Sequence, residues 1–449
     1  MSNPLASPVP PTLLSLQAAL EEARAGDDPA RLAEALLALG RAYLEAGHTP
    51  RALTQFEEGT TLAGEIGDEM AARFWGYKGI AVLRLGNTHM AQIALNKSYN
   101  LAKASGHSSL MADALLQLGT LQSEMGEPTK ALSKFERALA EALAAGDRVR
   151  VMHAAGRAGA LCHGLEAAEK ALEYFGLALT EAEALGDQAA LATYHSGAGN
   201  VYLAAGELEM AVEHLEQALE LATAGGNRAA ESKALGHLMR AHIAGGKASL
   251  ATLYGESALR LAHEAGEPAA ELDTILLLSS FLLEREETAK ALGYVEQGLA
   301  VAAELDDWGW LLAMHRLAGA AQEHRDALDD ALAHYEQALE MALRLQDWPA
   351  AARLQGEIAA LHGEMGAYGA GLEAARRAVE MAAKVDDAQL LGEQQMLLAY
   401  AHADLGEMAE AVTSCATAHE AFSSAGQTAL AEQAQALLAA LSEGSYGGS

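Results

Sequence analysis

Two glycine-rich stretches are the residues in this sequence whose spacing could bind a nucleotide. Residues 369–374, GAGLEA, match the GxGxxA pattern, and residues 197–202, GAGNVY, resemble half of such a loop. A dinucleotide site needs this pattern directly after a β-strand, where the glycines let the backbone approach the pyrophosphate. Neither stretch follows a strand pattern, so we interpret both as parts of helices and expect no nucleotide site.

The histidines and cysteines do not form a catalytic or metal-binding pattern either. No HExxH motif occurs, and His237 and His242 are five residues apart, which places them poorly for one helix face. Cys162 and Cys415 occupy expected core positions and lack the basic neighbours that activate a thiolate. We therefore expect a non-catalytic protein with no metal ion and no cofactor.

The composition limits the partners and the compartment. The 449 residues carry a formal net charge of −31, which repels nucleic acids and anionic membranes. The N-terminus has no basic segment before an apolar one, and the apolar run at residues 275–283 is about half of a membrane span. We expect a soluble, cytoplasmic protein with no nucleic-acid partner and no membrane partner.

A period of 40 residues defines the elements that position these side chains. A turn-forming residue recurs at Gly67, Gly106, Gly146, Gly186, Gly226, Gly266, Asp306, Gln346, Asp386 and Gly426. A second marker lies about midway between these positions, and the apolar residues in between fall at helical spacing. The sequence therefore predicts a disordered arm at 1–10, a helix at 11–26, ten two-helix repeats over 27–426, a capping helix at 427–442 and a flexible tail at 443–449.

The residues inside these repeats resemble the tetratricopeptide repeat pattern. In the first repeat the matching residues are Leu36, Leu39, Gly40, Tyr43, Ala52 and Phe56. The 40-residue length resembles the subclass found in kinesin light chains, Leu-Gly-Asn-type adaptors and bacterial Rap-type regulators. This resemblance implies an all-α, right-handed superhelical solenoid that binds proteins or peptides.

The concave face of such a solenoid is lined by the first helix of each repeat. Counting from the small residue that lets the paired helices approach, we predict the inward positions of repeats four to six. They give a peptide-binding groove formed by His153, Arg157, Thr193, Asn200, Lys233, His237 and Arg240. This wall is basic in an acidic molecule, which favours an acidic ligand segment. In the alternative interpretation, Arg157 and Lys233 only neutralise Asp113 and Asp273.

Trp308 and Trp348 are one period apart and are expected on the same edge of the solenoid. They form either buried packing between repeats or an exposed aromatic site for a partner. For the whole chain we predict a scaffold or adaptor that holds an extended acidic segment. The alternatives are a ligand-gated signalling regulator that acts on a separate effector protein and a structural scaffold that self-associates.

Overall fold

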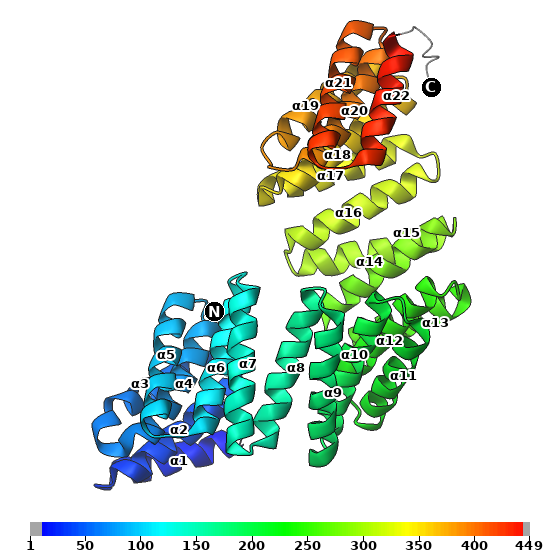
Figure 1. Ribbon diagram of the computed structural model, residues 1–449. Coiled ribbons are helices and arrows are strands. Elements are labelled where there is room, and N and C mark those ends of the chain that lie inside the picture. Colours follow the sequence, from blue (N-terminus) through cyan, green and yellow to red (C-terminus); the bar gives the residue numbers. More distant parts are fainter. Residues whose placement is uncertain (1–10, 443–449) are drawn as a thin grey trace, which may run out of the picture. The chain divides into compact units, whose positions relative to one another are not determined.

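A computed structural model describes residues 11–442, which form 22 α-helices and no β-strand (Figure 1). The predicted arm at 1–10 and tail at 443–449 lie outside the described residues. Consecutive helices pack in antiparallel pairs, so the predicted all-α solenoid of helix pairs is confirmed. The chain divides into two compact units, Met1–Gly245 and Gly246–Ser449.

The first unit contains twelve of the described helices. Their bounds are α1 (Pro11–Arg24), α2 (Pro29–Glu45), α3 (Thr49–Thr61), α4 (Ala63–Arg84), α5 (Thr88–Ala104), α6 (Ser108–Glu124), α7 (Pro128–Ala145), α8 (Arg148–Gly164), α9 (Ala168–Leu185), α10 (Gln188–Ala204), α11 (Leu208–Ala224) and α12 (Arg228–Ala244). The even-numbered helices from α2 onward are the first helices of the repeats, and the odd-numbered ones are the second helices.

The second unit continues this order. Its described helices are α13 (Ala248–Ala265), α14 (Pro268–Glu284), α15 (Thr288–Glu304), α16 (Trp308–Glu323), α17 (Leu328–Leu345), α18 (Trp348–Glu364), α19 (Tyr368–Ala382), α20 (Ala388–Asp404), α21 (Met408–Ser424) and α22 (Thr428–Ser442). The first and last described helices, α1 and α22, extend beyond the ten predicted repeats at residues where the sequence predicts terminal helices.

The periodic turns follow from their residue types. Gly146 ends α7 in the left-handed conformation, with φ of 63°, which glycine adopts without a steric penalty. Asp147 then accepts a hydrogen bond from the backbone N–H of Arg150 and so caps α8. The same glycine–aspartate arrangement recurs at Gly186 and Asp187. One residue pair therefore stops one helix and starts the next.

Two turns differ from the simple period. At Gly67 the backbone has φ 77° and ψ 164°, so the predicted break lies inside the span Ala63–Arg84 instead of between two separate helices. At Asp386 the helix before the turn ends early, at Ala382, and the turn residue does not take a positive φ. Both sites keep the repeat length although the local geometry changes.

In several first helices a glycine at one fixed position of the repeat, such as Gly119, sets the distance between the paired helices. A Cβ atom on Gly119 of α6 would lie 2.5 Å from the ring of Phe135 on α7, closer than side-chain carbon atoms can approach. Phe135 is 3% exposed and packs with Ala131 and Ala158 in the core. Glycine at this position therefore lets an aromatic ring fill the space between the helices.

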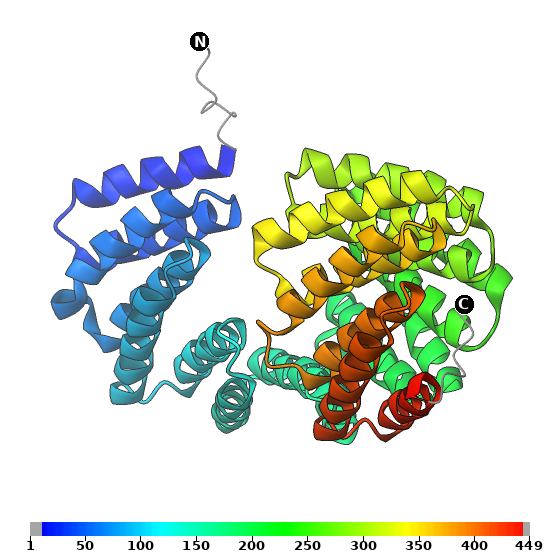
Figure 2. The ribbon, with the colours of Figure 1, turned by 90° about the horizontal axis from the view of Figure 1, so that it is seen from above.

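The first helices also contact one another from repeat to repeat. In the first unit, α2 touches α4, α4 touches α6, and the series continues through α8 and α10 to α12. Among the described helices, neighbouring second helices such as α5 and α7 make no comparable contact. Within the first unit, the first helices therefore form a closely spaced inner row and the second helices an outer row. Figure 2 shows the successive helices of this unit, from blue to green, packed side by side.

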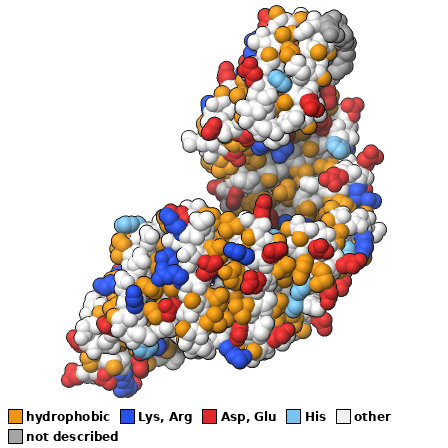
Figure 3. All heavy atoms as spheres, in the orientation of Figure 1, with side chains coloured by type: hydrophobic (Ala, Val, Ile, Leu, Met, Phe, Trp, Pro, Cys, Tyr) orange, Lys and Arg blue, Asp and Glu red, His pale blue; other side chains and the backbone are white. Residues whose placement is uncertain are grey.

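None of the helices within residues 11–442 is long and apolar enough to cross a membrane. On the face seen in Figure 3, carboxylate side chains are spread over both units and are interspersed with basic and apolar ones.

Candidate functional site

The inner row of the first unit is hollowed by a cavity of about 480 Å³ between α2, α4, α6 and α8. We call it the cationic cavity, because three arginines, Arg41, Arg84 and Arg157, line it together with two acids, Glu45 and Glu124. Each of these residues lies at an inward position of its own repeat. The cavity therefore combines residues from four consecutive repeats, as a ligand groove requires.

The arginines of the cationic cavity lack carboxylate partners. Among the residues that the structure describes, Arg41, Arg84 and Arg157 form no ion pair with any acid within 4 Å. Arg84 donates a hydrogen bond to the carbonyl oxygen of Leu44 at 2.8 Å, and Arg41 lies over the ring of Tyr77 at 5.6 Å. Their positive charge is thus available to an anionic ligand.

The alternative pairing of Arg157 with Asp113 is not formed. Asp113 is bound by Arg150, whose guanidinium lies 2.6 Å from the carboxylate and also contacts Asp147. The hydrogen bond to Asp113, followed by the other contacts, raises the pKa of Arg150. The charge of Asp113 is therefore already neutralised by Arg150. Arg157 does not form the ion pair with Asp113 that the alternative interpretation requires.

The structure places the seven predicted groove residues on three successive first helices. His153 and Arg157 lie on α8, Thr193 and Asn200 on α10, and Lys233, His237 and Arg240 on α12. All are exposed except Asn200 and His237, which are half-buried. The hydroxyl of Thr193 donates to the carbonyl oxygen of Ala189 at 2.9 Å, so this group is occupied inside its helix.

Asn200 and His237 form the closest polar contact of this wall. The Nδ2 atom of Asn200 lies 3.0 Å from Nε2 of His237, so the two first helices α10 and α12 are joined by this pair. Burial, and then the nearby charges of Arg240 and Lys233, lower the pKa of His237 to about 4. The imidazole is therefore neutral at pH 7, and its buried Nδ1 atom has no hydrogen-bond partner among the described residues.

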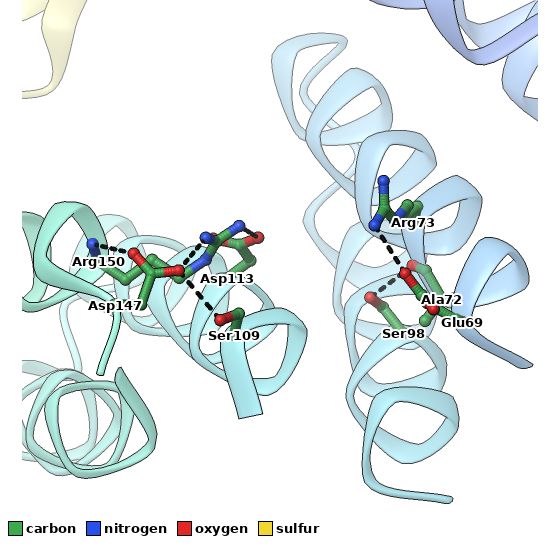
Figure 4. Close-up of polar contacts among 8 residues, drawn as sticks. All are labelled: Glu69, Ala72, Arg73, Ser98, Ser109, Asp113, Asp147 and Arg150. Atoms are coloured by element: carbon green, nitrogen blue, oxygen red, sulfur yellow. Dashed lines mark hydrogen bonds and ion pairs between the residues drawn. The ribbon is translucent and has the colours of Figure 1, made fainter. Parts of the chain in front are cut away.

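A second cavity of about 540 Å³ adjoins the cationic cavity, and we call it the inner cavity. Its lining includes Leu37, Gly76, Leu95, Ser98, Leu110 and Ala114. Charged side chains also line this cavity, and they include Arg150 and Asp113, which form an ion pair, and the pair of Arg73 with Glu69 at 2.7 Å (Figure 4). The hydroxyl of Ser98 donates to the carbonyl oxygen of Ala72 at 2.7 Å, so this group is occupied within the protein.

Arg41, Arg84 and the inner cavity are parts of the site that sequence reasoning missed. The two arginines occupy other inward positions of the same register: Arg41 follows Gly40 directly and Arg84 lies five residues after Gly79, whereas Arg157 lies two residues before Gly159. Extending the register to the first repeats would have found them. The inner cavity is harder to predict from the sequence, because it depends on the sizes of two residues, Gly76 and Ala114, that lie on different helices.

The second unit has its own inner-row cavity of about 480 Å³. Its lining includes Arg353 and Ala360 from α18, and Glu393, Leu397 and Tyr400 from α20. The pKa of the nearby Glu357 is raised, mainly by burial, although Arg316 counteracts this by a hydrogen bond at 3.0 Å. One arginine, Arg353, lines this cavity beside Glu357 and Glu393, so it is less positive than the cationic cavity, which has three arginines and two acids.

Trp308 and Trp348 begin α16 and α18 at equivalent positions. Each ring is half-buried and is covered by a cation from the same repeat: the guanidinium of Arg344 lies 5.0 Å from the ring centre of Trp308, and Nζ of Lys384 lies 3.8 Å from that of Trp348. The two tryptophans thus share one environment, in which a flexible basic side chain lies over each aromatic face.

Two histidine pairs connect first and second helices and were not predicted. Nδ1 of His195 lies 3.0 Å from Nδ1 of His214, and Nδ1 of His315 lies 3.1 Å from Nδ1 of His334. The pairs are 120 residues apart, which is three periods. Burial is the main cause that lowers the pKa of all four imidazoles, so the pairs are neutral at pH 7.

No group of three or more metal-ligating side chains gathers within residues 11–442. Cys162 and Cys415 are buried, as expected, and burial is the main cause that raises the pKa of both thiols. Neither cysteine has the character of a catalytic nucleophile.

The fold and its cavities define an all-α solenoid of helix pairs whose inner row is hollowed. The family model of the tetratricopeptide repeat matches residues 114–149 and 195–229. The chain therefore contains tetratricopeptide repeats, as the residue pattern indicates. No curated protein matches the sequence.

Several solved structures have a similar fold. The quorum sensor NprR from B. thuringiensis shares 13% sequence identity, with 82% of this chain and 99% of that chain covered and a TM-score of 0.54. Aspartyl phosphate phosphatase F from Bacillus subtilis shares 13% identity, with 85% and 96% covered and a TM-score of 0.50.

A signal transduction ATPase with numerous domains from Pyrococcus horikoshii, which has a tetratricopeptide repeat sensor, gives a TM-score of 0.58. It shares 14% identity, and the match covers 82% of this chain but 56% of the ATPase chain. At these identities the similarity shows the shared fold. The residues that would bind a ligand must be argued from this chain alone.

Proposed function

We propose that the protein is a non-catalytic, cytoplasmic scaffold or adaptor that holds an extended acidic segment of a partner protein or peptide in the inner row of its first unit. The site comprises the cationic cavity and the predicted groove residues His153, Arg157, Thr193, Asn200, Lys233, His237 and Arg240. Arg157 belongs to both parts and joins them.

The observation that carries this proposal is the set of unpaired cations on the inner row. Within the first unit, Arg157, Lys233 and Arg240 make no ion pair, whereas several arginines elsewhere in the molecule do, such as Arg344 with Glu340 at 2.5 Å. In a chain of net charge −31, basic groups without carboxylate partners on the inner face are expected to bind an anionic ligand. Acidic side chains or a free carboxylate meet this requirement.

Asn200 contributes a different kind of contact. Its amide has both a donor and an acceptor, and His237 uses one of these groups. The remaining donor or acceptor can bind the main chain of an extended ligand. Because His237 is held neutral by burial, it fixes the orientation of Asn200 without adding a charge.

A ligand-gated regulator is the second candidate function. The fold shared with the quorum sensor NprR supports it, because the name of that protein describes a sensor. In this case the acidic segment would be a signal, and the bound form would act on a separate effector protein. Self-association into a structural scaffold is the third candidate.

Selection from a phage-displayed library of random 12-residue peptides tests the first proposal. We expect enriched peptides to be rich in Asp and Glu and to bind more weakly as salt rises, because the contacts are partly solvated. Arg157→Glu combined with Arg240→Glu should abolish detectable binding, because each charged hydrogen bond contributes on the order of 1.5–3 kcal/mol.

Lys103→Glu combined with Lys170→Glu is the matched control. Both lysines are exposed on second helices, so this variant has the same change in net charge on the outer row. It should keep wild-type affinity. If the Arg157 and Arg240 variant kept its affinity but melted at a lower temperature, the arginines would be structural and the proposed groove would be wrong.

A further inference from the structure

The inner cavity lies where a glycine on one first helix, Gly76, and a small side chain on the next, Ala114, line the same space. Gly76 on α4 has nothing closer to an added Cβ atom than Oγ of Ser98, at 3.1 Å. Two periods later, the equivalent Gly156 on α8 is covered by Tyr194 of the next first helix, whose ring would lie 2.2 Å from an added Cβ. The residue equivalent to Tyr194 in the cavity is Ala114 on α6.

The second unit repeats the filled arrangement. Gly356 on α18 is covered by Gln394 on α20, whose Oε1 atom would lie 2.5 Å from a Cβ at that position. Gln394 is seven periods after Ala114, and Tyr194 is two periods after it. At this register, Gly156 and Gly356 therefore receive a large side chain from the next first helix, whereas Gly76 faces alanine and Gly236 has open space around it.

The inner cavity has the dimensions and lining of a ligand site. Its volume of about 540 Å³ lies within the range of small-molecule pockets, and Leu37, Leu95 and Leu110 contribute to its lining. It shares Arg41, Tyr77, Ile80 and Gln117 with the cationic cavity, so the two cavities are continuous. A recess lined partly by leucine side chains therefore lies directly beside three arginines that have no carboxylate partner.

We propose that the inner cavity takes one aromatic side chain of the bound segment, and that the cationic cavity binds a carboxylate within about three residues of it. The arrangement of Gly156 and Tyr194 shows that an aromatic ring packs against glycine at this register of the fold. In the inner cavity the ligand supplies the ring that Ala114 does not. This inference rests on the proposed function and narrows its ligand to an acidic segment with an aromatic anchor.

The selected phage peptides test this inference through their consensus. We expect Phe, Tyr or Trp within three residues of Asp or Glu. A synthetic peptide of that sequence should bind at least tenfold more tightly, by isothermal titration calorimetry, than its counterpart with serine in place of the aromatic residue. Salt should weaken both peptides.

Ala114→Tyr gives this site the residue that the chain itself has at Tyr194, so it fills the cavity with a side chain that the fold accommodates elsewhere. We expect it to weaken the aromatic peptide at least tenfold and to leave the serine peptide unchanged. Gly76→Leu fills the cavity from the opposite wall and should act in the same way. Gly236→Leu is the control, because Gly236 has the same register on α12 and open space around it.

The outcomes separate the two proposals. An acidic consensus without an aromatic residue, or wild-type binding of the aromatic peptide by Ala114→Tyr and by Gly76→Leu, would overturn the aromatic anchor and keep the acidic groove. A consensus without acidic residues, or no consensus, would overturn both. Circular dichroism and melting curves of each variant check that it is folded. If one cavity variant does not fold, the other variant and the comparison of the aromatic and serine peptides still test the proposal.

Discussion

His237 is held in an environment that favours its neutral form. It is half-buried on α12, bonded to Asn200, and close to the charges of Lys233 and Arg240. Burial lowers its pKa to about 4, whereas a histidine in an unfolded chain has a pKa near 6.5. Because the folded pKa is the lower one, the unfolded state binds more protons between these two values.

This difference predicts acid sensitivity. The stability that neutral His237 contributes is fully present above about pH 6.5 and is lost as the pH falls towards 4. Between pH 7 and pH 4.5, we expect the free energy of unfolding of the wild type to fall by about 2–3 kcal/mol more than that of His237→Gln. Urea unfolding of the two proteins across this range measures the difference.

His153→Gln is the matched control for this measurement. His153 is exposed on α8 of the same unit, so its replacement should leave the wild-type pH dependence unchanged. Parallel stability curves for wild type and His237→Gln would show that the environment of His237 is not as buried as the structure places it.

At the level of the helix pair, the close approach of α6 and α7 depends on Gly119. Alanine would improve the helix propensity of α6 by about 1 kcal/mol, but its Cβ would overlap the ring of Phe135. The ring lies in a closely packed core and has little room to move. The overlap therefore outweighs the gain in propensity.

We predict that Gly119→Ala lowers the free energy of unfolding by about 1–3 kcal/mol, as overpacking does in other cores. Gly236→Ala should raise it by about 0.5–1 kcal/mol, because Gly236 is also within a helix but has open space around it. Urea unfolding of the two variants compares them directly. Equal effects of the same sign would mean that the close contact at Gly119 does not set the helix spacing.

The positions of the helices could be predicted from the sequence, because the turns and caps that bound a helix depend on a few neighbouring residues. A glycine that takes a positive φ and a following aspartate act over a few residues, so Gly146 and Asp147 can be recognised without the fold. The inner cavity is different, since it depends on Ala114 facing Gly76 across two helices 38 residues apart. Likewise, the partner of Asp113 was assigned wrongly in the alternative interpretation, because Arg150 and Arg157 lie on the same helix and spacing alone does not distinguish them.

In the whole molecule, each helix pair is stabilised mainly by contacts with its neighbours. A terminal helix therefore covers apolar surface that no other helix would cover. The last described helix, α22, buries Ala431, Ala434 and Leu441 against α20 and α21. Cys415 on α21 donates to the carbonyl oxygen of Ala434 at 3.1 Å. Without α22, this apolar surface would be open to water.

We therefore predict that deletion of residues 427–449 lowers the melting temperature or the solubility of the protein. Deletion of residues 443–449 alone is the control and should change neither. Differential scanning calorimetry and size-exclusion chromatography measure the two properties. A 427–449 deletion that melts like the wild type and stays monodisperse would contradict a capping role for α22.

The unequal contacts of the two helix rows have a mechanical consequence. In the first unit, the first helices touch from α2 to α12, while the second helices lack comparable contacts with one another. A force that spreads the outer row therefore breaks few contacts, whereas one that spreads the inner row separates helices that are packed together. The unit should behave as an elastic spring whose stiffness resides in its inner row, and a segment bound across α2 to α8 would stiffen it.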